Sequence, residues 1–433
     1  MPESGSESTV GIAPTADEIA RVQRRTVWVL SGGQVLGGLA FGATLSLGAV
    51  LAAELSGEDA LSGLAAAAVT FGTALTAVPL AAIARRRGRR LSLTTGMAVA
   101  LIGAGLVILA VALRSFPVLL AGFLIIGSGQ AANLQSRFAA ADLATDASRG
   151  RDLSIVVWAT TVGAVLGPNL TGPGEVIGGA IGMPPLTGAY LFTLVAQGLA
   201  IVLYVLAMRP DPLLLAQRVV ASAKAGSRAI AKADRPVAAR YAIFAVAAAH
   251  GTMVSVMAMT PVHLAHLTHD ASEAATLSII GLTISLHIAG MYVLSPVFGI
   301  LADRAGRVPT ILLGQALLAA ALLTASFGQA STTAVTVALV LLGLGWSATT
   351  VAGSTLLTES SAEGLRTRRQ GLSDFTMSIV GGVGAITAGA LLGWIGYGGL
   401  SLVVLVLVAA SVLFSPLGWR ASAAQTREAA PGA

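Results

Sequence analysis

Residues 299–307 read GILADRAGR and connect two long apolar segments, 275–300 and 308–328. Gly306 permits the tight reversal between two antiparallel helices, because glycine adopts positive φ without a steric cost. Asp303 carries a carboxylate that can accept hydrogen bonds from the free amides at the N-terminus of a neighbouring helix. The stretch therefore predicts a charged turn between two helices that are long enough to cross a membrane.

The composition also favours a membrane protein. Of 433 residues, 55% are hydrophobic and 11% are charged, whereas soluble domains carry about 25% charged residues. The absence of cysteine excludes disulfides and thiolate chemistry. The net charge is +6, but the basic residues lie between apolar segments rather than on one face, so we expect no nucleic-acid partner. Phosphate-loop, dinucleotide and hydrolase motifs are missing, so we expect neither an enzyme nor a cofactor.

Twelve segments are long and apolar enough to cross a hydrocarbon core of about 30 Å. They are 27–52, 61–84, 92–113, 117–141, 153–172, 188–208, 240–262, 275–300, 308–328, 333–357, 373–396 and 399–418. With both termini in the cytoplasm, 25 of the 26 Lys and Arg residues fall on the cytoplasmic side, and only Arg114 does not. We therefore expect an all-α, multi-pass protein of a bacterial inner (plasma) membrane, in contact with the lipid bilayer and without a cleavable signal peptide.

The longest polar interruption divides the chain into two parts. We expect the following domains: a cytoplasmic tail at 1–26, a six-helix bundle at 27–208, a cytoplasmic linker at 209–239, a second six-helix bundle at 240–418 and a cytoplasmic tail at 419–433. The ends, 1–16 and 421–433, have too few apolar residues to order themselves, so we expect them to be disordered.

The two parts also repeat each other. Residues 81–90 read AAIARRRGRR, and GILADRAGRV follows at 299–308, an offset of 218 residues. Parallel repeats of this kind place a substrate site near the middle of the membrane, between the two halves.

Residues 299–307 resemble the signature of major facilitator superfamily transporters, which occurs between their second and third helices and again between their eighth and ninth. The matching residues are Gly299, Leu301, Asp303, Arg304, Gly306 and Arg307. The resemblance covers roughly residues 25–420 and implies two pseudo-symmetric bundles that rock about a central site. It also implies that this loop latches one state closed. The alternative is a solvated turn that is held only by its basic side chains.

The copy at 81–90 departs from the family pattern. Ala81 replaces the first glycine, and Arg85 stands where the aspartate belongs. Since Asp374 lies at the start of the span 373–396, we predict that Arg85 or Arg86 pairs with Asp374 in a latch with exchanged charges. The alternative is that Asp374 caps its own helix.

The span 153–172 carries glycines and a proline at regular intervals, namely Gly163, Gly167, Pro168 and Gly172. This run resembles the glycine-proline motif of antiporter branches of the superfamily, which implies export. The same residues also fit a kinked helix that packs closely against a neighbour.

Polar residues inside the spans are the candidates for substrate binding, because polar groups at membrane depth usually face a cavity. They are Gln34, Gln130, Asn133, Arg137, Asn169, His250 and His287. Gln130, Asn133 and Arg137 share one helical face, at i, i+3 and i+7, whereas Gln135 points elsewhere. That face either binds substrate or joins helices. The two histidines could exchange protons or serve only in packing.

We predict a secondary active transporter that works by alternating access and exports a small organic or drug-like compound in exchange for protons. The alternatives are proton-coupled uptake of a small metabolite and, in another class, a membrane sensor or assembly factor that does not transport. We expect a monomer. We expect no metal site, because His263, His266 and His269 lie at a helix end and in the following irregular loop, without an adjacent cysteine. The span 27–52 has no carboxylate at mid-depth, which counts against proton coupling.

Overall fold

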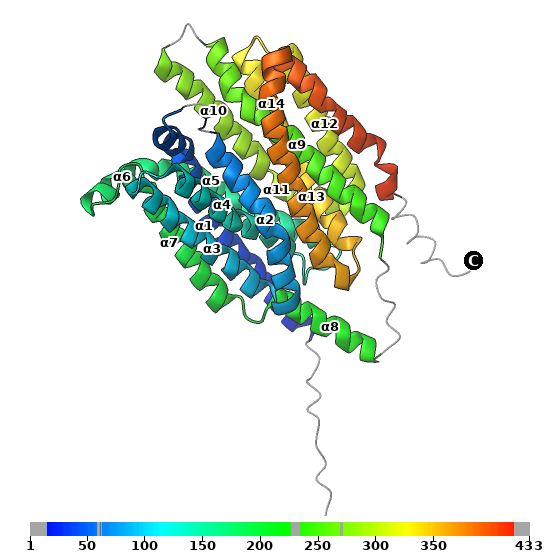
Figure 1. Ribbon diagram of the computed structural model, residues 1–433. Coiled ribbons are helices and arrows are strands. Elements are labelled where there is room, and N and C mark those ends of the chain that lie inside the picture. The colour runs from blue at the N-terminus through cyan, green and yellow to red at the C-terminus, as the bar shows by residue number, and fades with distance from the viewer. Residues whose placement is uncertain (1–14, 59–60, 62, 227–233, 269–271, 420–433) are drawn as a thin grey trace, which may run out of the picture.

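The computed structural model describes residues 15–58, 61, 63–226, 234–268 and 272–419. The predicted disorder of the two ends concerns residues that lie almost entirely outside these ranges. Within the described residues the chain is nearly all helical (Figure 1). The helices are α1 (Ala16–Ser56), α2 (Leu64–Arg87), α3 (Arg89–Ala112), α4 (Phe116–Ala139), α5 (Arg149–Asn169), α6 (Thr171–Ala180), α7 (Ala189–Ala207), α8 (Pro212–Gly226), α9 (Pro236–Leu267), α10 (Glu273–Tyr292), α11 (Ser295–Ala305), α12 (Arg307–Phe327), α13 (Thr332–Glu359) and α14 (Glu363–Leu413).

The number of membrane crossings agrees with the predicted twelve. Within the described residues, ten helices are long and apolar enough to cross a membrane, and eleven when α5 and α6, which meet at a 57° bend, count as one. At 1.5 Å per residue, the 51 residues of α14 would extend over about 76 Å if the helix were straight, more than twice the hydrocarbon core. Gly396 breaks this helix with φ 71° and ψ 178°, and the chain turns back there (Figure 1). Two crossings in α14 therefore give twelve.

The first helix begins earlier than the sequence predicts. Thr15 caps α1 by accepting a hydrogen bond from the Glu18 amide at 3.3 Å, and acidic residues in the first turn favour a helix start. Gln23, expected in a cytoplasmic tail, is buried and donates to the Ala140 carbonyl oxygen at 2.7 Å. Residues 16–26 therefore belong to α1, which extends into the predicted tail at 1–26.

The predicted linker contains a helix of its own. Asp211 accepts hydrogen bonds from the amides of Leu213 and Leu214 at 3.0 and 3.2 Å, which starts α8. Figure 1 shows α8 as a separate helix at one end of the bundle. Asp211 also accepts from the Arg90 amide at 2.7 Å, so it ties α8 to the first turn of α3.

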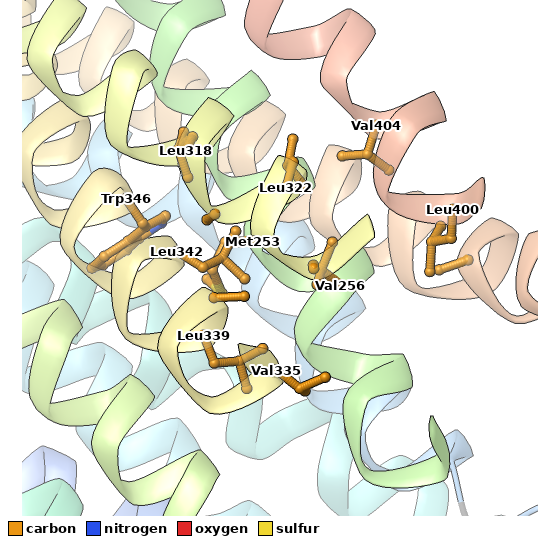
Figure 2. Packing of buried hydrophobic residues seen from close by; sticks show 14 of the residues in the cluster. Met253, Val256, Leu318, Leu322, Val335, Leu339, Leu342, Trp346, Leu400 and Val404 are labelled. Atoms are coloured by element: carbon orange, nitrogen blue, oxygen red, sulfur yellow. The ribbon is translucent and has the colours of Figure 1, made fainter. Parts of the chain in front are cut away.

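Each part of the molecule has its own apolar core. The core among α9, α12, α13 and α14 includes Met253, Leu318, Leu339, Trp346 and Leu400 (Figure 2). A second core lies among α1, α3, α4 and α7. We call α1–α7 the N-half and α9–α14 the C-half. The halves meet where α2 packs against α14 and α5 packs against α11. These two contacts position the site.

Candidate functional site between the two halves

One end of the bundle carries the arginines at 85–90 and 304–307, and we call it the basic end. Residues 299–307 comprise the end of α11, Gly306 and the start of α12. We call this segment the C-half loop, and it closes this end against α5. Asp303 Oδ1 accepts from the Gly150 amide and Oδ2 from the Arg151 amide, both at 2.9 Å. Amides in the first turn of a helix have no partner within that helix, so Asp303 caps α5 across the boundary between the halves. The predicted contact of Asp303 with a neighbouring helix N-terminus is present.

The rest of the C-half loop supports this contact. Arg307 Nη2 donates to Glu359 Oε1 at 2.6 Å and to the Asp146 carbonyl oxygen of the N-half at 2.8 Å. At Gly299, a Cβ atom would lie 2.5 Å from the Gly150 carbonyl oxygen, so glycine is required for the approach of α11 to α5. Gly306 has φ 100°, which favours glycine at the reversal. Arg304 is exposed.

We call the α5–α11 contact and the α2–α14 contact the two seams between the halves. The equivalent N-half loop, residues 81–90, closes the α2–α14 seam with different groups. Arg89 is fully buried; its Nε donates to Asp142 at 2.8 Å and its Nη2 donates to Gln370 Oε1 of the C-half at 2.6 Å. At Gly371, a Cβ atom would lie 2.4 Å from the Ala81 Cβ atom. The glycine that this loop lacks is therefore supplied by the opposing helix, α14.

The predicted pairing of Arg85 or Arg86 with Asp374 is wrong for this conformation. Asp374 is fully buried and pairs with Arg137 at 2.5 Å. Arg86 is exposed at the surface and Arg85 is half-buried. Since α14 begins at Glu363, Asp374 lies 11 residues inside the helix and cannot cap its start, so the alternative is also wrong.

The Arg137–Asp374 ion pair is a buried charged contact between the halves. Arg137 Nη2 donates to Asp374 Oδ1, and the two side chains are 3% and 0% exposed. Arg137 Nε and Asp374 Oδ2 have no hydrogen-bond partner among the described residues. The pair therefore uses only part of the hydrogen-bonding capacity of both groups.

Aromatic side chains of the C-half lie near this pair. His250 and Tyr292 are close enough to Arg137 to interact electrostatically with its charge. Trp346 Nε1 donates to His250 Nδ1 at 3.1 Å, and the Trp346 and Tyr292 rings meet edge to face at 5.9 Å. The structure therefore brings His250 to the Arg137 site, while Tyr292 and Trp346 had not been singled out from the sequence.

The rest of the polar face of α4 lines a small cavity inside the N-half. Gln130 and Asn133 border it together with Gly37, Phe41 and Gln197. Its volume is about 10 Å³, which is enough for one water molecule. Gln34 is also close, because its Nε2 donates to the Asn133 carbonyl oxygen at 2.8 Å. Gln197 of α7 was not singled out from the sequence.

Two other polar candidates, and Gln135, lie elsewhere. His287 is fully buried, and its Nδ1 bonds the Leu339 carbonyl oxygen at 2.7 Å, inside the C-half. Asn169 is exposed and donates to the Val165 carbonyl oxygen of its own helix at 2.7 Å. Gln135 points away from the cavity, as predicted, and donates to the Ala77 carbonyl oxygen at 2.9 Å. His287 and Asn169 are therefore not brought to the Arg137 site.

The predicted outer histidines do not form a metal site in the part of the chain that the structure describes. His263 bonds the Gln329 carbonyl oxygen at 2.8 Å and stacks on Tyr397 with 4.2 Å between ring centroids. His269 lies outside the described residues.

The glycine-proline run at 163–172 is divided between α5 and α6. At Gly163, a Cβ atom would lie 2.2 Å from the Val35 carbonyl oxygen of α1, so this glycine serves close packing. Gly167 is buried. The helix ends at Asn169, just after Pro168, and Gly172 belongs to α6, where a Cβ atom would meet open space. The four residues therefore do not form one continuous packing face.

Two helical bundles that meet through charged contacts at one end and through a buried ion pair define a class of polytopic membrane protein built from two halves. A family model for the Major Facilitator Superfamily matches residues 30–279 and 245–431. The chain belongs to this superfamily, whose members are transporters and not enzymes. The resemblance carried by residues 299–307 is confirmed.

Similar proteins support this assignment along the whole chain. The chain is 34% identical over 418 residues to the uncharacterized MFS-type transporter YddS of Bacillus subtilis, covering 94% of this chain and 93% of YddS. It is 29% identical over 427 residues to the riboflavin transporter RfnT of Brucella anthropi, covering 93% and 99% of the two chains. The human organic anion transporter MFSD10 (TETRAN) has the same fold, with a TM-score of 0.72, 19% identity and coverage of 91% and 99%.

Proposed function

We propose that the protein is a monomeric secondary active transporter that exports a small organic or drug-like compound by alternating access, in exchange for protons. In this proposal it spans a bacterial inner membrane with both termini and the basic end in the cytoplasm. The observation that carries it is the construction of the basic end. Asp303, Arg89 and Arg137 each bond a group of the opposite half, so the halves are joined by contacts that can separate.

The two seams at the basic end are suited to opening. The amides that Asp303 caps belong to the first turn of α5, and water can replace a carboxylate there once the halves move apart. Asp303, Arg304, Gly306 and Arg307 then act as a latch of the state closed at the basic end. Arg89 and Gln370 complete the latch in the N-half, in place of Arg85 and Arg86.

Asp374 is the candidate for proton coupling, although the sequence placed it at the end of a span. Asp374 is a fully buried carboxylate between the halves, and its pairing with Arg137 depends on its negative charge. A proton on Asp374 would remove that charge and weaken the pair. Export is favoured by the likeness of the run 163–172 to the antiporter motif.

Two alternatives remain. Proton-coupled uptake of a metabolite is favoured by the similarity to a riboflavin transporter. A sensor or assembly factor was favoured by the altered sequence at 81–90. The bond of Arg89 to Gln370 joins this loop to the C-half, which weakens the main argument for a protein without motion.

The proposal is tested by flux in everted membrane vesicles. A panel of labelled organic compounds, riboflavin included, is offered with and without an imposed pH gradient. Accumulation that depends on the gradient, and that stops when the gradient is collapsed, supports proton-coupled export. Accumulation only in right-side-out vesicles would favour uptake, and binding without accumulation in either orientation would favour a sensor.

A further inference from the structure

We propose that the transported compound is a small organic anion, and that its carboxylate or a similar group replaces Asp374 on Arg137 when the halves separate. This inference rests on the proposed transport function and names the substrate class of the same site. It starts from the position of the pair. Arg137 belongs to α4 of the N-half and Asp374 to α14 of the C-half, so their 2.5 Å contact breaks whenever the basic end opens.

The two partners differ in what they need after the contact breaks. The groups around Asp374 are Arg137 of α4 and Arg89 of α3, while His250 of α9 and Tyr292 of α10 lie near Arg137. Asp374 can take a proton from water on the open side and become neutral. An arginine guanidinium cannot be deprotonated in a protein. Arg137, which is 2% exposed in the closed state, therefore keeps its positive charge when the contact breaks and attracts another anion, whereas Asp374 needs no other cation.

The guanidinium also has a hydrogen-bond donor that Asp374 does not use. Asp374 contacts only Nη2, and Nε is buried without a partner among the described residues. Nε and one Nη of arginine form a planar fork that matches the two oxygens of a carboxylate. A free carboxylate can approach this fork in the ideal direction, which a side chain fixed on α14 does not do. A substrate anion is therefore able to compete with Asp374.

The polar face above Arg137 indicates what else the anion carries. Asn133 lies one helical turn from Arg137 on the same face, and its Oδ1 is buried without a partner among the described residues. Gln130 continues the face toward Phe41. A carbonyl oxygen accepts hydrogen bonds, so the geometry fits an acid that bears a hydroxyl or amino group near its carboxylate.

The test uses formate as the probe and the purified full-length chain in detergent. In Asp374→Asn, Arg137 has lost its carboxylate, and formate can take that place. Sodium formate should therefore raise the unfolding temperature of Asp374→Asn by about 2 °C over sodium chloride of equal ionic strength. The matched control is Arg137→Gln/Asp374→Asn, which should show no difference between the two salts. Asp374→Ala serves as the second variant if the asparagine variant does not fold.

Equal formate effects in the single and double variants would overturn the anion site. A formate effect that requires Arg137 would support it. A second arm compares 4-hydroxybenzoate with 4-hydroxybenzamide on the wild-type chain, and preferential stabilisation by the acid is expected. Flux of neutral compounds without any effect of formate would refute this inference and leave the transport function intact. A formate effect without flux of any compound would do the reverse.

Discussion

The C-half loop and the N-half loop occupy equivalent positions in the two repeats and close equivalent seams with different chemistry. In the C-half loop, the carboxylate of Asp303 caps the backbone of α5. In the N-half loop, Arg85 stands at the equivalent position, and the contact across the seam is made by Arg89 with Gln370. A backbone cap in one half is replaced by a side-chain bond in the other.

The glycines of the two seams also differ in which side they occupy. In the C-half loop the glycine is on the loop side, since Gly299 lies against Gly150 of α5. In the N-half loop it is on the opposing helix, since Gly371 lies against Ala81. What the two repeats share is thus the close approach of the helices and polar bonds across each seam. The residue that provides each feature differs.

The largest effect is expected at the ion pair that lies between the two seams. Arg137→Gln leaves the carboxylate of Asp374 buried without its partner in the closed state, and breaking a buried pair in this way costs about 3–5 kcal/mol. Because Asp374 approaches water when the basic end opens, the loss falls on the closed state rather than on the fold. We expect near-complete loss of transport in Arg137→Gln at normal membrane abundance, measured by flux and immunoblot.

Two further variants sharpen this result. Arg137→Lys keeps the charge but loses the planar fork, so we expect impaired transport. Arg137→Gln/Asp374→Asn removes both charges and should return part of the closed state that Arg137→Gln loses. Full flux in Arg137→Lys would reduce Arg137 to a topology anchor.

A smaller effect is expected from Asp303→Asn. Asparagine has one acceptor oxygen in place of two, and its amino group would face one of the two amides of α5. Loss of a hydrogen bond to a charged group is worth roughly 1.5–3 kcal/mol, so the closed state should lose that amount and flux should fall. Expression should stay normal. Wild-type flux together with unchanged labelling of a cysteine introduced at Ala305, at the basic end, would remove Asp303 from the mechanism.

The glycine exchange tests the comparison between the seams directly. Gly371→Ala introduces a Cβ atom 2.4 Å from the Ala81 Cβ atom, and overpacking of this kind costs about 1–3 kcal/mol. Ala81→Gly in the same chain removes the opposing methyl group and gives the N-half loop the arrangement of the C-half loop. Unfolding temperatures of the two single variants and the double variant should show recovery in the double variant. Additive destabilisation would mean that the two residues do not meet.

The smallest effect is expected outside both seams, at Asp234. Its hydrogen bond with Arg369, at 2.6 Å, is the main cause that lowers the pKa of this carboxyl group below its usual range. A lowered pKa stabilises the folded chain above the ordinary value of about 3.9 and loses that contribution as the pH falls through the folded value. Since the pair is solvent-exposed, it contributes no more than about 1 kcal/mol. Asp234→Asn should lower the unfolding temperature slightly at pH 7, and the difference should vanish at strongly acidic pH.

Much of the fold follows from hydropathy and charge alone. The apolar segments gave the crossings, and the arginines at 304–307 gave one end of the bundle. Hydropathy failed where a helix extends beyond its apolar part. The polar residues 363–372 belong to α14, so the sequence placed Asp374 at a helix start when it is 11 residues inside.

The site was predictable only in part, for a different reason. Arg137 and Asn133 stand out because polar residues in apolar spans are rare. Their partners do not, since Asp374 is 237 residues from Arg137 and Gln370 is 281 residues from Arg89. Pairings over such distances depend on how the halves dock, and no local pattern in one chain encodes that.

The central claim is that contacts at the basic end hold the halves together in a state that can open. It is tested most directly by pulsed electron-spin distance measurements, for which the cysteine-free chain is well suited. Spin labels at Ala147→Cys of the N-half and Ala305→Cys of the C-half lie on exposed positions at this end. We predict one short distance in the wild-type background. In the variants a second, longer distance should appear, and its population should be larger in Arg137→Gln than in Asp303→Asn. A single unchanged distance in all three backgrounds would contradict the account.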